Sequence, residues 1–359
     1  MTEWLNKCHF GDVRTVLRQM IADGVKVQTT VTSPPYWGLR DYGHAGQLGL
    51  EKTPEEYVSN MVDVFSLVRD ATTEDGTLWL NIGDSYASGG SAGQSGKSTL
   101  KGNGHGGDKQ LSPYLQVQNA TAVVRKPAPG YKPKDLVGIP WMVAFALRAS
   151  GWYLRQEIIW AKPNPMPESV TDRCTKSHEQ IFLLAKASSY YCDMGAIKEP
   201  VALSTVQRLS QDVENQQGSF RVPGKTNGAM KAVGKGGKNA FRGQGHFREG
   251  QTGPANRDGR DMSDVGAGDD RNKRSVWTVS TKPYKGAHFA TFPTELIEPC
   301  ILAGAPAGGL VLDPFFGSGT TGQVAQQLGR QFIGIELNPD YKALQDERLR
   351  QPSLALEAA

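Results

Sequence analysis

Residues 33–36, with the sequence S-P-P-Y, carry groups suited to binding a flat molecule that has an amino group. They directly follow 27–32, VQTTVT, a run typical of a strand. Two successive prolines stiffen the backbone and remove two N–H donors. The Ser33 hydroxyl and the Pro34 carbonyl then remain as acceptors for an NH₂ group, while the Tyr36 ring can stack on its plane. Taken alone, such a turn is also common without any function.

A second segment that could bind a ligand is the glycine-rich turn 313–322, DPFFGSGTTG. It follows the strand-like run 310–313 and opens the helix-like run 320–329. In this setting a glycine turn brings backbone N–H groups close to a ligand. Glu336 lies fourteen residues after the last glycine, at the end of the strand-like run 331–337. A carboxylate there can accept hydrogen bonds from both ribose hydroxyls of an adenosine group.

The glycine turn also has alternative interpretations. Residues 317–322 match G-x-G-x-x-G, which is typical of a nicotinamide-dependent oxidoreductase. However, only 37 residues follow Gly322, and a carboxylate and bulky rings precede the glycines where a pyrophosphate favours neither. A P-loop is excluded because no lysine follows the glycines. An ordinary strand–turn–helix without a ligand remains open.

Taken together, the two motifs resemble the signatures of the DNA amino-methyltransferases, (S/D/N)-P-P-(Y/F) and D-x-F-x-G-S-G-T. In this sequence S-P-P-Y comes first and the glycine motif last, with a variable basic section between them. This order is similar to the beta arrangement of the family, a circular permutation of the methyltransferase sheet. The resemblance also includes residues 11–12, 80–84, 152–163, 177–179 and 292–296.

The resemblance implies that S-adenosylmethionine donates a methyl group to the exocyclic amino group of a base flipped out of DNA. It assigns catalysis to Ser33, Pro34, Pro35 and Tyr36. It assigns the cofactor to Asp12, Thr32, Thr294, Asp313, Phe315, Gly317, Gly319 and Glu336. From the residues alone, Asp12 could instead cap the helix that begins DVRTVLRQM. Trp37 is interpreted as a core residue rather than a second stacking surface.

Ser33 is the residue on which the choice of base depends. In the family, serine before Pro-Pro-Tyr is typical of N4-cytosine enzymes, and aspartate or asparagine of N6-adenine enzymes. We therefore expect an N4-cytosine enzyme, with N6-adenine as the alternative. An RNA amino-methyltransferase and a non-catalytic DNA-binding protein are more distant alternatives. A carbon-5 cytosine enzyme is disfavoured because the one Pro-Cys pair, 299–300, falls in a run expected to be helical.

Strand-like and helix-like runs alternate along most of the chain and predict an α/β fold. Further strands are expected at 76–83, 153–161 and 179–185, and helices at 54–70 and 136–149. With the resemblance, this predicts a Rossmann-like methyltransferase sheet, mostly parallel, circularly permuted and with helices on both faces. We expect a catalytic half at 1–200 with a flexible loop at 88–110, a target-recognition region at 201–285, and a cofactor-binding half at 286–359.

Residues 201–280 differ from the rest of the chain in composition. They hold 13 glycines, 13 Lys/Arg and eight Asp/Glu, a net charge of +5 in a chain whose net charge is +4. Such a stretch is either a solvated insertion or a surface that follows a phosphate backbone. The second interpretation makes ten basic residues candidates for DNA binding: Arg221, Lys225, Lys231, Lys235, Lys238, Arg242, Arg248, Arg271, Lys273 and Arg274.

Composition sets the remaining expectations for this chain of 359 residues with a mean hydropathy of −0.44. No apolar run reaches the length of a membrane helix, and no secretory signal is visible, so we expect a cytoplasmic protein. The four cysteines and six histidines show no ligand spacing, so no metal is expected. The expected partners are double-stranded DNA, a second copy in a homodimer and a cognate restriction endonuclease.

Overall fold

The computed structural model describes residues 2–87, 121–122, 128–165, 167–168, 170–201, 270–281 and 292–350. The chain divides into two units, one formed by Met1–Ile197 with Arg274–Ala359 and the other by Lys198–Lys273. In the second unit, β8 (Glu199–Pro200) pairs antiparallel with β9 (Asp270–Arg271). The expected flexible loop 88–110 lies outside the described residues, as does most of the expected target-recognition region.

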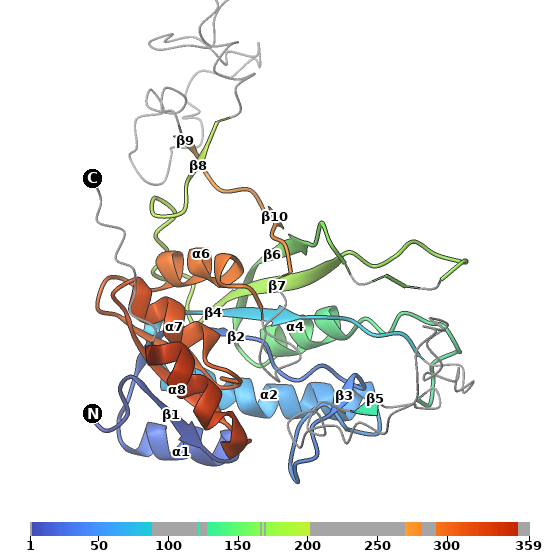
Figure 1. Ribbon diagram of the computed structural model, residues 1–359, viewed down its shortest axis with the longest axis horizontal. Coiled ribbons are helices and arrows are strands. Elements are labelled where there is room, and N and C mark those ends of the chain that lie inside the picture. Colours follow the sequence, from blue (N-terminus) through green and yellow to red (C-terminus); the bar gives the residue numbers. More distant parts are fainter. Residues whose placement is uncertain are drawn as a thin grey trace, which may run out of the picture. The chain divides into compact units, whose positions relative to one another are not determined.

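An eight-stranded sheet forms the centre of the first unit (Figure 1). All neighbouring pairs are parallel except those of β7, which runs antiparallel to both β4 and β6. In spatial order the strands are β1 (Lys7–Phe10), β12 (Gln331–Glu336), β11 (Leu310–Asp313), β2 (Val27–Thr32), β4 (Thr72–Ile82), β7 (His178–Ala185), β6 (Tyr153–Ala161) and β10 (Val276–Thr278). A two-residue pair, β3 (Arg40–Asp41) with β5 (Thr121–Ala122), lies outside this sheet.

The order of the strands shows the permutation. β1, near the start of the chain, pairs with β12, near its end, and Lys7 aligns with Ile333. The glycine motif follows β11 and the S-P-P-Y motif follows β2, its direct neighbour. The predicted mostly parallel, Rossmann-like sheet is therefore confirmed.

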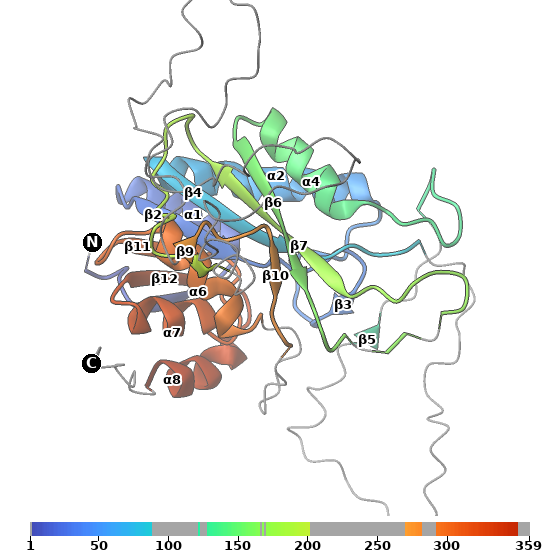
Figure 2. The same cartoon turned by 90° about the horizontal axis from the view of Figure 1, so that it is seen from above.

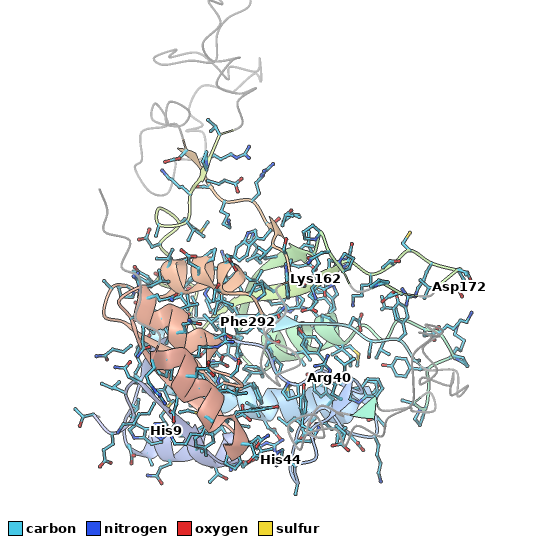
Figure 3. The ribbon with its side chains drawn as sticks, viewed as in Figure 1. His9, Arg40, His44, Lys162, Asp172 and Phe292 are labelled. Carbon is cyan, nitrogen blue, oxygen red and sulfur yellow. The ribbon has the colours of Figure 1, made fainter. Side chains whose placement is uncertain are left out.

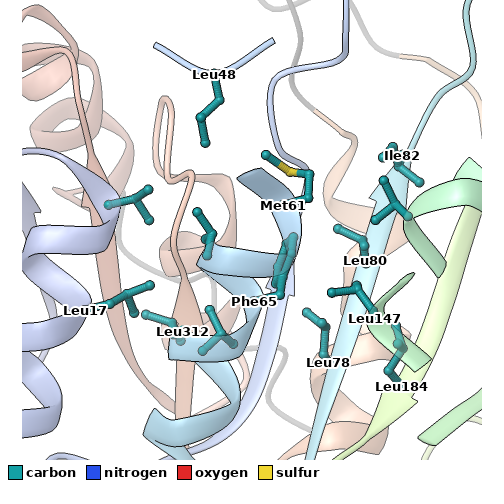
Figure 4. Close-up of a cluster of buried hydrophobic side chains, with 14 of the residues drawn as sticks. Leu17, Leu48, Met61, Phe65, Leu78, Leu80, Ile82, Leu147, Leu184 and Leu312 are labelled. Carbon is teal, nitrogen blue, oxygen red and sulfur yellow. The ribbon is translucent and has the colours of Figure 1, made fainter. Parts of the chain in front are cut away.

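Helices cover both faces of the sheet (Figures 1 and 2). One core lies under α1 (Val13–Ala22), α2 (Pro54–Ala71) and α4 (Ile139–Ala149), and Figure 4 shows part of it. The other core lies under α6 (Thr294–Gly304) and α7 (Thr320–Gln327). Strand residues alternate between the two cores: Leu312 of β11 belongs to the first and Val311 to the second. The described residues end with a 3₁₀ turn, Pro339–Tyr341, and α8 (Lys342–Arg350).

The start of α2 shows how closely local signals predict an element. Thr53 caps the helix, which was predicted to start at 54, and its side chain accepts a hydrogen bond from the Glu56 backbone N–H at 3.1 Å. The Glu56 carboxylate accepts from the Lys52 backbone N–H at 3.0 Å.

The predicted start of the helix at 136 is wrong, because α4 begins at Ile139. The Asp84 carboxylate accepts the backbone N–H groups of Gly138 and Ile139, at 2.9 and 3.0 Å. This cap comes from a distant strand end, so no signal near residue 136 could reveal it. The helix predicted at 320–329 likewise ends earlier, at Gln327, and the strand predicted at 76–83 starts earlier, at Thr72.

Two kinds of feature are not found in the described part of the chain. None of its helices is long and apolar enough to cross a membrane. None of its clusters of His, Cys, Asp and Glu side chains could hold a metal ion.

Candidate active site

The structure brings the two sequence motifs together at one edge of the sheet. β2 and β11 are parallel neighbours, with Thr30 aligned with Leu312, so both strands end at the same edge. At this edge the Thr32 hydroxyl donates to Asp313 Oδ1 at 2.6 Å. A buried hydrogen bond thus joins two motifs that lie 281 residues apart in the sequence.

Asp313 holds the start of the glycine turn. Its side chain is 2% exposed, and burial raises its pKa to about 6. Three donors oppose this rise in pKa: Thr32, the Thr321 hydroxyl at 2.6 Å, and the Phe315 backbone N–H at 3.1 Å. Both carboxylate oxygens of Asp313 therefore bind the chain itself, and Asp313 connects the turn with β2.

Glu336, at the end of β12, binds the next part of the turn. Its Oε2 accepts the Gly317 backbone N–H at 2.7 Å, and its Oε1 accepts the Asn338 backbone N–H at 2.9 Å. Burial raises the pKa of Glu336, and these two hydrogen bonds act against the rise. Because each carboxylate oxygen has two lone pairs, Glu336 can still accept from a ligand such as the two ribose hydroxyls.

The glycine turn itself has features that fit a polar ligand. Gly317 and Gly319 have φ angles of 53° and 88°, in the left-handed region that favours glycine, and Gly319 is the N-cap of α7. Between them, the Ser318 hydroxyl is buried without a hydrogen-bond partner among the described residues. A buried unpaired hydroxyl is costly, so a ligand that bonds to it would be stabilised. These residues fit the nucleoside part of S-adenosylmethionine.

Other residues predicted to contact the cofactor have contacts within the protein. Asp12 caps α1, since its Oδ1 accepts the Thr15 backbone N–H at 3.1 Å. The Phe315 ring meets Phe65 edge to face, with centroids 6.4 Å apart. Thr294 is the first residue of α6, and its hydroxyl donates to the Glu295 carboxylate at 3.1 Å.

Asp12 nevertheless lies at the edge that carries the motifs. The backbone N–H of Gly11, the residue before it, donates to the Glu336 carbonyl at 2.9 Å. The role of Asp12 as a helix cap is therefore confirmed, while a contact with the cofactor stays a prediction.

The S-P-P-Y motif is anchored by several hydrogen bonds. The Pro35 carbonyl accepts the Tyr57 hydroxyl of α2 at 2.9 Å. The Ser33 hydroxyl donates to the Tyr36 oxygen at 3.3 Å, and the Tyr36 hydroxyl donates to Glu179 Oε2 at 2.7 Å. Burial, together with the nearby Glu179 charge, raises the pKa of Tyr36 well above its usual value. Trp37 is 6% exposed and belongs to the core, so its interpretation as a core residue is confirmed.

Sequence reasoning did not assign a role to three residues beside Tyr36. Glu179 is the second residue of β7, just before its buried part, and Asn81 lies near the end of β4. Lys162, labelled in Figure 3, follows β6. All three residues fall inside segments that carry the family resemblance, and that was the available signal. Asn81 and Glu179 contact Tyr36, and Lys162 contacts Glu179, only because of the order of the strands, which local sequence does not contain.

Most residues predicted to bind DNA lie outside the described part of the chain, namely Arg221, Lys225, Lys231, Lys235, Lys238, Arg242 and Arg248. In the second unit, Arg271 Nε donates to Glu199 Oε1 at 3.0 Å. In the first unit, the Arg274 carbonyl accepts the Trp277 indole N–H at 2.7 Å.

Comparisons with known proteins agree with this geometry. The family model described as DNA methylase, for the N6 and N4 enzymes, matches residues 27–347. The Type II methyltransferase M.Cfr9I of Citrobacter freundii is 42% identical over 340 residues, covering 95% of this chain and 86% of that protein. M.SmaI of Serratia marcescens is 41% identical, covering 94% and 89%.

Among solved structures, the cytosine-N4-specific PvuII DNA methyltransferase matches with a TM-score of 0.53 at 15% identity, covering 95% of this chain and 85% of that one. This match shows a shared fold. The chain therefore belongs to the N6/N4 DNA methylase family and is an S-adenosylmethionine-dependent DNA methyltransferase.

Proposed function

We propose that this methyltransferase modifies the N4 amino group of cytosine in double-stranded DNA. The observation that carries the proposal is the hydrogen bond between Thr32 and Asp313. This bond joins the residue before the S-P-P-Y motif to the residue that begins the glycine turn, which supports a site in which the two motifs act together. The preference for cytosine is supported by Ser33, since serine at this position resembles the N4-cytosine enzymes of the family. N6-adenine is the alternative.

The proposed chemistry starts from the weak nucleophilicity of an amino group on a base, whose lone pair is delocalised into the ring. Ser33 Oγ and the Pro34 carbonyl accept its two hydrogens and favour a more tetrahedral nitrogen. S-adenosylmethionine supplies an electrophilic methyl group on its sulfonium. Ser33 and the glycine turn hold the two reactants in line, which supplies much of the rate acceleration. Tyr36, whose ring is half-buried, stacks on the flipped base.

The remaining parts of the proposal concern binding and context. We assign the cofactor to Asp12, Thr32, Thr294, Asp313, Phe315, Gly317, Gly319 and Glu336. The basic residues of 201–280 would contact DNA phosphates, with Arg271, Lys273 and Arg274 near that section's end. Relatives named Type II methyltransferases favour a cognate restriction endonuclease as a functional partner. We also propose a homodimer and a cytoplasmic location.

The test is a methyl-transfer assay on unmodified duplex DNA, followed by nuclease digestion and mass spectrometry of the nucleosides. We expect N4-methyl-2′-deoxycytidine. N6-methyldeoxyadenosine would retain the enzyme class and reject the role given to serine at position 33. Methylation of duplex RNA in preference to DNA would reject DNA as the substrate. Binding of S-adenosylmethionine without any methylated nucleoside would favour a non-catalytic DNA-binding protein.

A further inference from the structure

Glu179 lies at the centre of a row of hydrogen bonds that crosses the sheet edge. It accepts the Tyr36 hydroxyl at 2.7 Å and the Asn81 amide N–H at 3.2 Å, both on Oε2. Its other oxygen, Oε1, pairs with Lys162. These residues lie in or just after β2, β4, β7 and β6, which are neighbours in this order. The row therefore connects the catalytic motif with the three strands next to it.

The ion pair fixes what Glu179 can do in this row. The side chains of Lys162 and Glu179 are each only 17% exposed. The Lys162 ammonium also lies 4.1 Å from the centre of the Trp160 ring, a distance at which a cation is attracted to the aromatic face. A carboxylate held in this way has lone pairs and no hydrogen to donate. Glu179 can therefore act only as an acceptor.

An acceptor at this position sets the direction of the whole chain of hydrogen bonds. Tyr36 has a single hydroxyl hydrogen with two acceptors in reach, Glu179 Oε2 at 2.7 Å and Asn81 Oδ1 at 3.3 Å, and the shorter bond to the charged carboxylate takes it. The Tyr36 oxygen can then only accept, and it accepts the Ser33 hydroxyl at 3.3 Å. With its one hydrogen used, Ser33 Oγ presents lone pairs alone.

We propose that Glu179, held by Lys162, is a positioning residue that makes Ser33 an acceptor for the substrate amino group. The inference rests on the proposed role of Ser33 and adds the reason why its hydroxyl does not donate. A serine hydroxyl that turned its hydrogen toward the substrate would oppose an NH₂ hydrogen. The direction set by Glu179 removes that competing arrangement before the base arrives.

The packing around Tyr36 supports a fixed arrangement. A Cβ added at Gly83 would lie 2.5 Å from Tyr36 Cε2 and 3.0 Å from Cδ2. The ring therefore rests directly on the backbone of residue 83. Held at its ring by this contact and at its hydroxyl by Glu179, Tyr36 has little freedom to present another geometry to Ser33.

The first experiment is Glu179→Gln in the full chain, assayed by single-turnover methyl transfer to duplex DNA. An amide of the same shape can donate as well as accept, so Glu179→Gln no longer fixes the direction of the hydrogen bonds through Tyr36 to Ser33. We expect the transfer rate to fall about ten- to a hundredfold, the loss typical of a buried hydrogen bond to a charged group. Dissociation constants for S-adenosylmethionine and DNA should stay within about twofold of the original, because Glu179 acts through Ser33. A rate equal to that of the unsubstituted enzyme would overturn the proposal.

A double-mutant cycle separates positioning from a general structural effect. In a Ser33→Ala background the hydroxyl that Glu179 directs is absent, so Glu179→Gln should cause little further loss. Equal losses in both backgrounds would overturn the proposal. Glu74→Gln is the matched control, since Glu74 pairs with Lys186 at 2.9 Å at the start of β4. It removes a Lys–Glu pair far along the strand from the motif and should leave the rate unchanged.

Two further measurements separate a failure to fold from a loss of positioning, and a failure of the positioning role from a failure of the proposed function. If thermal unfolding shows that Glu179→Gln does not fold, Tyr36→Phe removes only the connecting hydroxyl and should give the same non-additive loss with Ser33→Ala. An additive loss in that cycle would overturn the proposal. If the unsubstituted enzyme forms no methylated nucleoside, the proposed function fails. If it does and Glu179→Gln is fully active, only the positioning role fails.

Discussion

At the scale of the residue, Ser33 offers the clearest separation of catalysis from cofactor binding. Ser33→Ala removes the proposed acceptor of the substrate amino group and leaves the glycine turn intact. We expect turnover to fall by about ten- to a thousandfold, as when one transition-state hydrogen bond is lost, with the dissociation constant for S-adenosylmethionine unchanged. Calorimetry and single-turnover kinetics measure the two quantities.

Two variants make this comparison specific. Ser150→Ala is the matched control, because the Ser150 hydroxyl bonds to the Leu147 carbonyl at the end of α4, and turnover should not change. Glu336→Gln should show the reverse pattern, with weaker cofactor binding, since Glu336 lies at the glycine turn. Unchanged turnover for Ser33→Ala would remove the hydroxyl from the mechanism.

Asp313 leads to a prediction about stability and pH. Burial raises its pKa from 3.8 to about 6 in the folded protein. Between these values the folded protein binds a proton that the unfolded chain lacks. The contribution of Asp313 to the free energy of unfolding therefore decreases as the pH rises from about 4 to 6, by about 3 kcal/mol in total.

The comparison of the original protein with Asp313→Asn isolates this contribution. Asparagine can accept from Thr32 and Phe315 and donate to Thr321, and it does not titrate. In urea unfolding at a series of pH values, the original protein should lose stability relative to the variant between about pH 4 and 6. Asp63→Asn, at an exposed position of α2, is the control. A stability difference that is constant with pH would contradict the raised pKa.

At the scale of the element, the turn after β11 is positioned by the Phe316 ring, which packs against two glycines, Gly334 and Gly322. The Phe316 ring stacks on Phe332 with centroids 5.4 Å apart. A Cβ at Gly334 would lie 2.4 Å from Phe316 Cγ, and one at Gly322 would lie 2.7 Å from Cζ. Because Gly334 in β12 and Gly322 in α7 have no side chains, the Phe316 ring has room to pack there and to hold the turn in place.

Gly334→Ala should push Phe316 away and disturb the turn. We expect a loss of about 2–3 kcal/mol in the free energy of unfolding, as for an overpacked core, with weaker binding of S-adenosylmethionine. Gly329→Ala is the control, because that glycine has a φ of 68° but open space around its Cβ position, so only about 1 kcal/mol should be lost. Denaturant unfolding measures both variants. Equal losses would show that packing on Phe316 is not the cause.

Local patterns predict elements well where the cause of the element is local. The bounds of β2, β6 and β11 agree with the predicted ranges, because alternating or continuous apolar runs produce them. The start of α4 could not be predicted in this way, because Asp84 reaches it from another strand. β1 was not predicted as a strand, and its four residues gain their pairing from β12 at the other end of the chain.

At the scale of the whole molecule, the active site requires residues that meet only through the strand order. The two motifs could be identified from their residues, but the pairing of β2 with β11 follows from the family resemblance rather than from periodicity. Glu179 and Lys162 illustrate the limit, because their relation to Tyr36 exists only once β4, β7 and β6 lie side by side. For the same reason, a sequence pattern identifies the acceptors of a site more readily than the residues that orient them.

The uneven distribution of charge along the chain leads to a prediction about DNA binding by the basic section, residues 201–280. Residues 201–280 carry a net charge of +5, so the remainder of the chain is slightly acidic. A protein that neutralises phosphates with lysines releases counterions, and its affinity then falls steeply with salt. We expect the triple variant Lys231→Gln, Lys235→Gln and Lys238→Gln to bind duplex DNA more weakly than the unsubstituted enzyme.

The salt dependence tells whether these lysines contact phosphates. Each lost contact should reduce the slope of log affinity against log salt by about 1, so the triple variant should lose up to about 3. Fluorescence anisotropy with labelled duplexes measures the slope, and S-adenosylmethionine binding should not change, because the proposed cofactor residues lie outside this section. Lys7→Gln, Lys52→Gln and Lys134→Gln together are the matched control, with the same change in net charge elsewhere in the chain. An equal change of slope in both triple variants would mean that net charge, and not a DNA-contacting surface in residues 201–280, governs the binding.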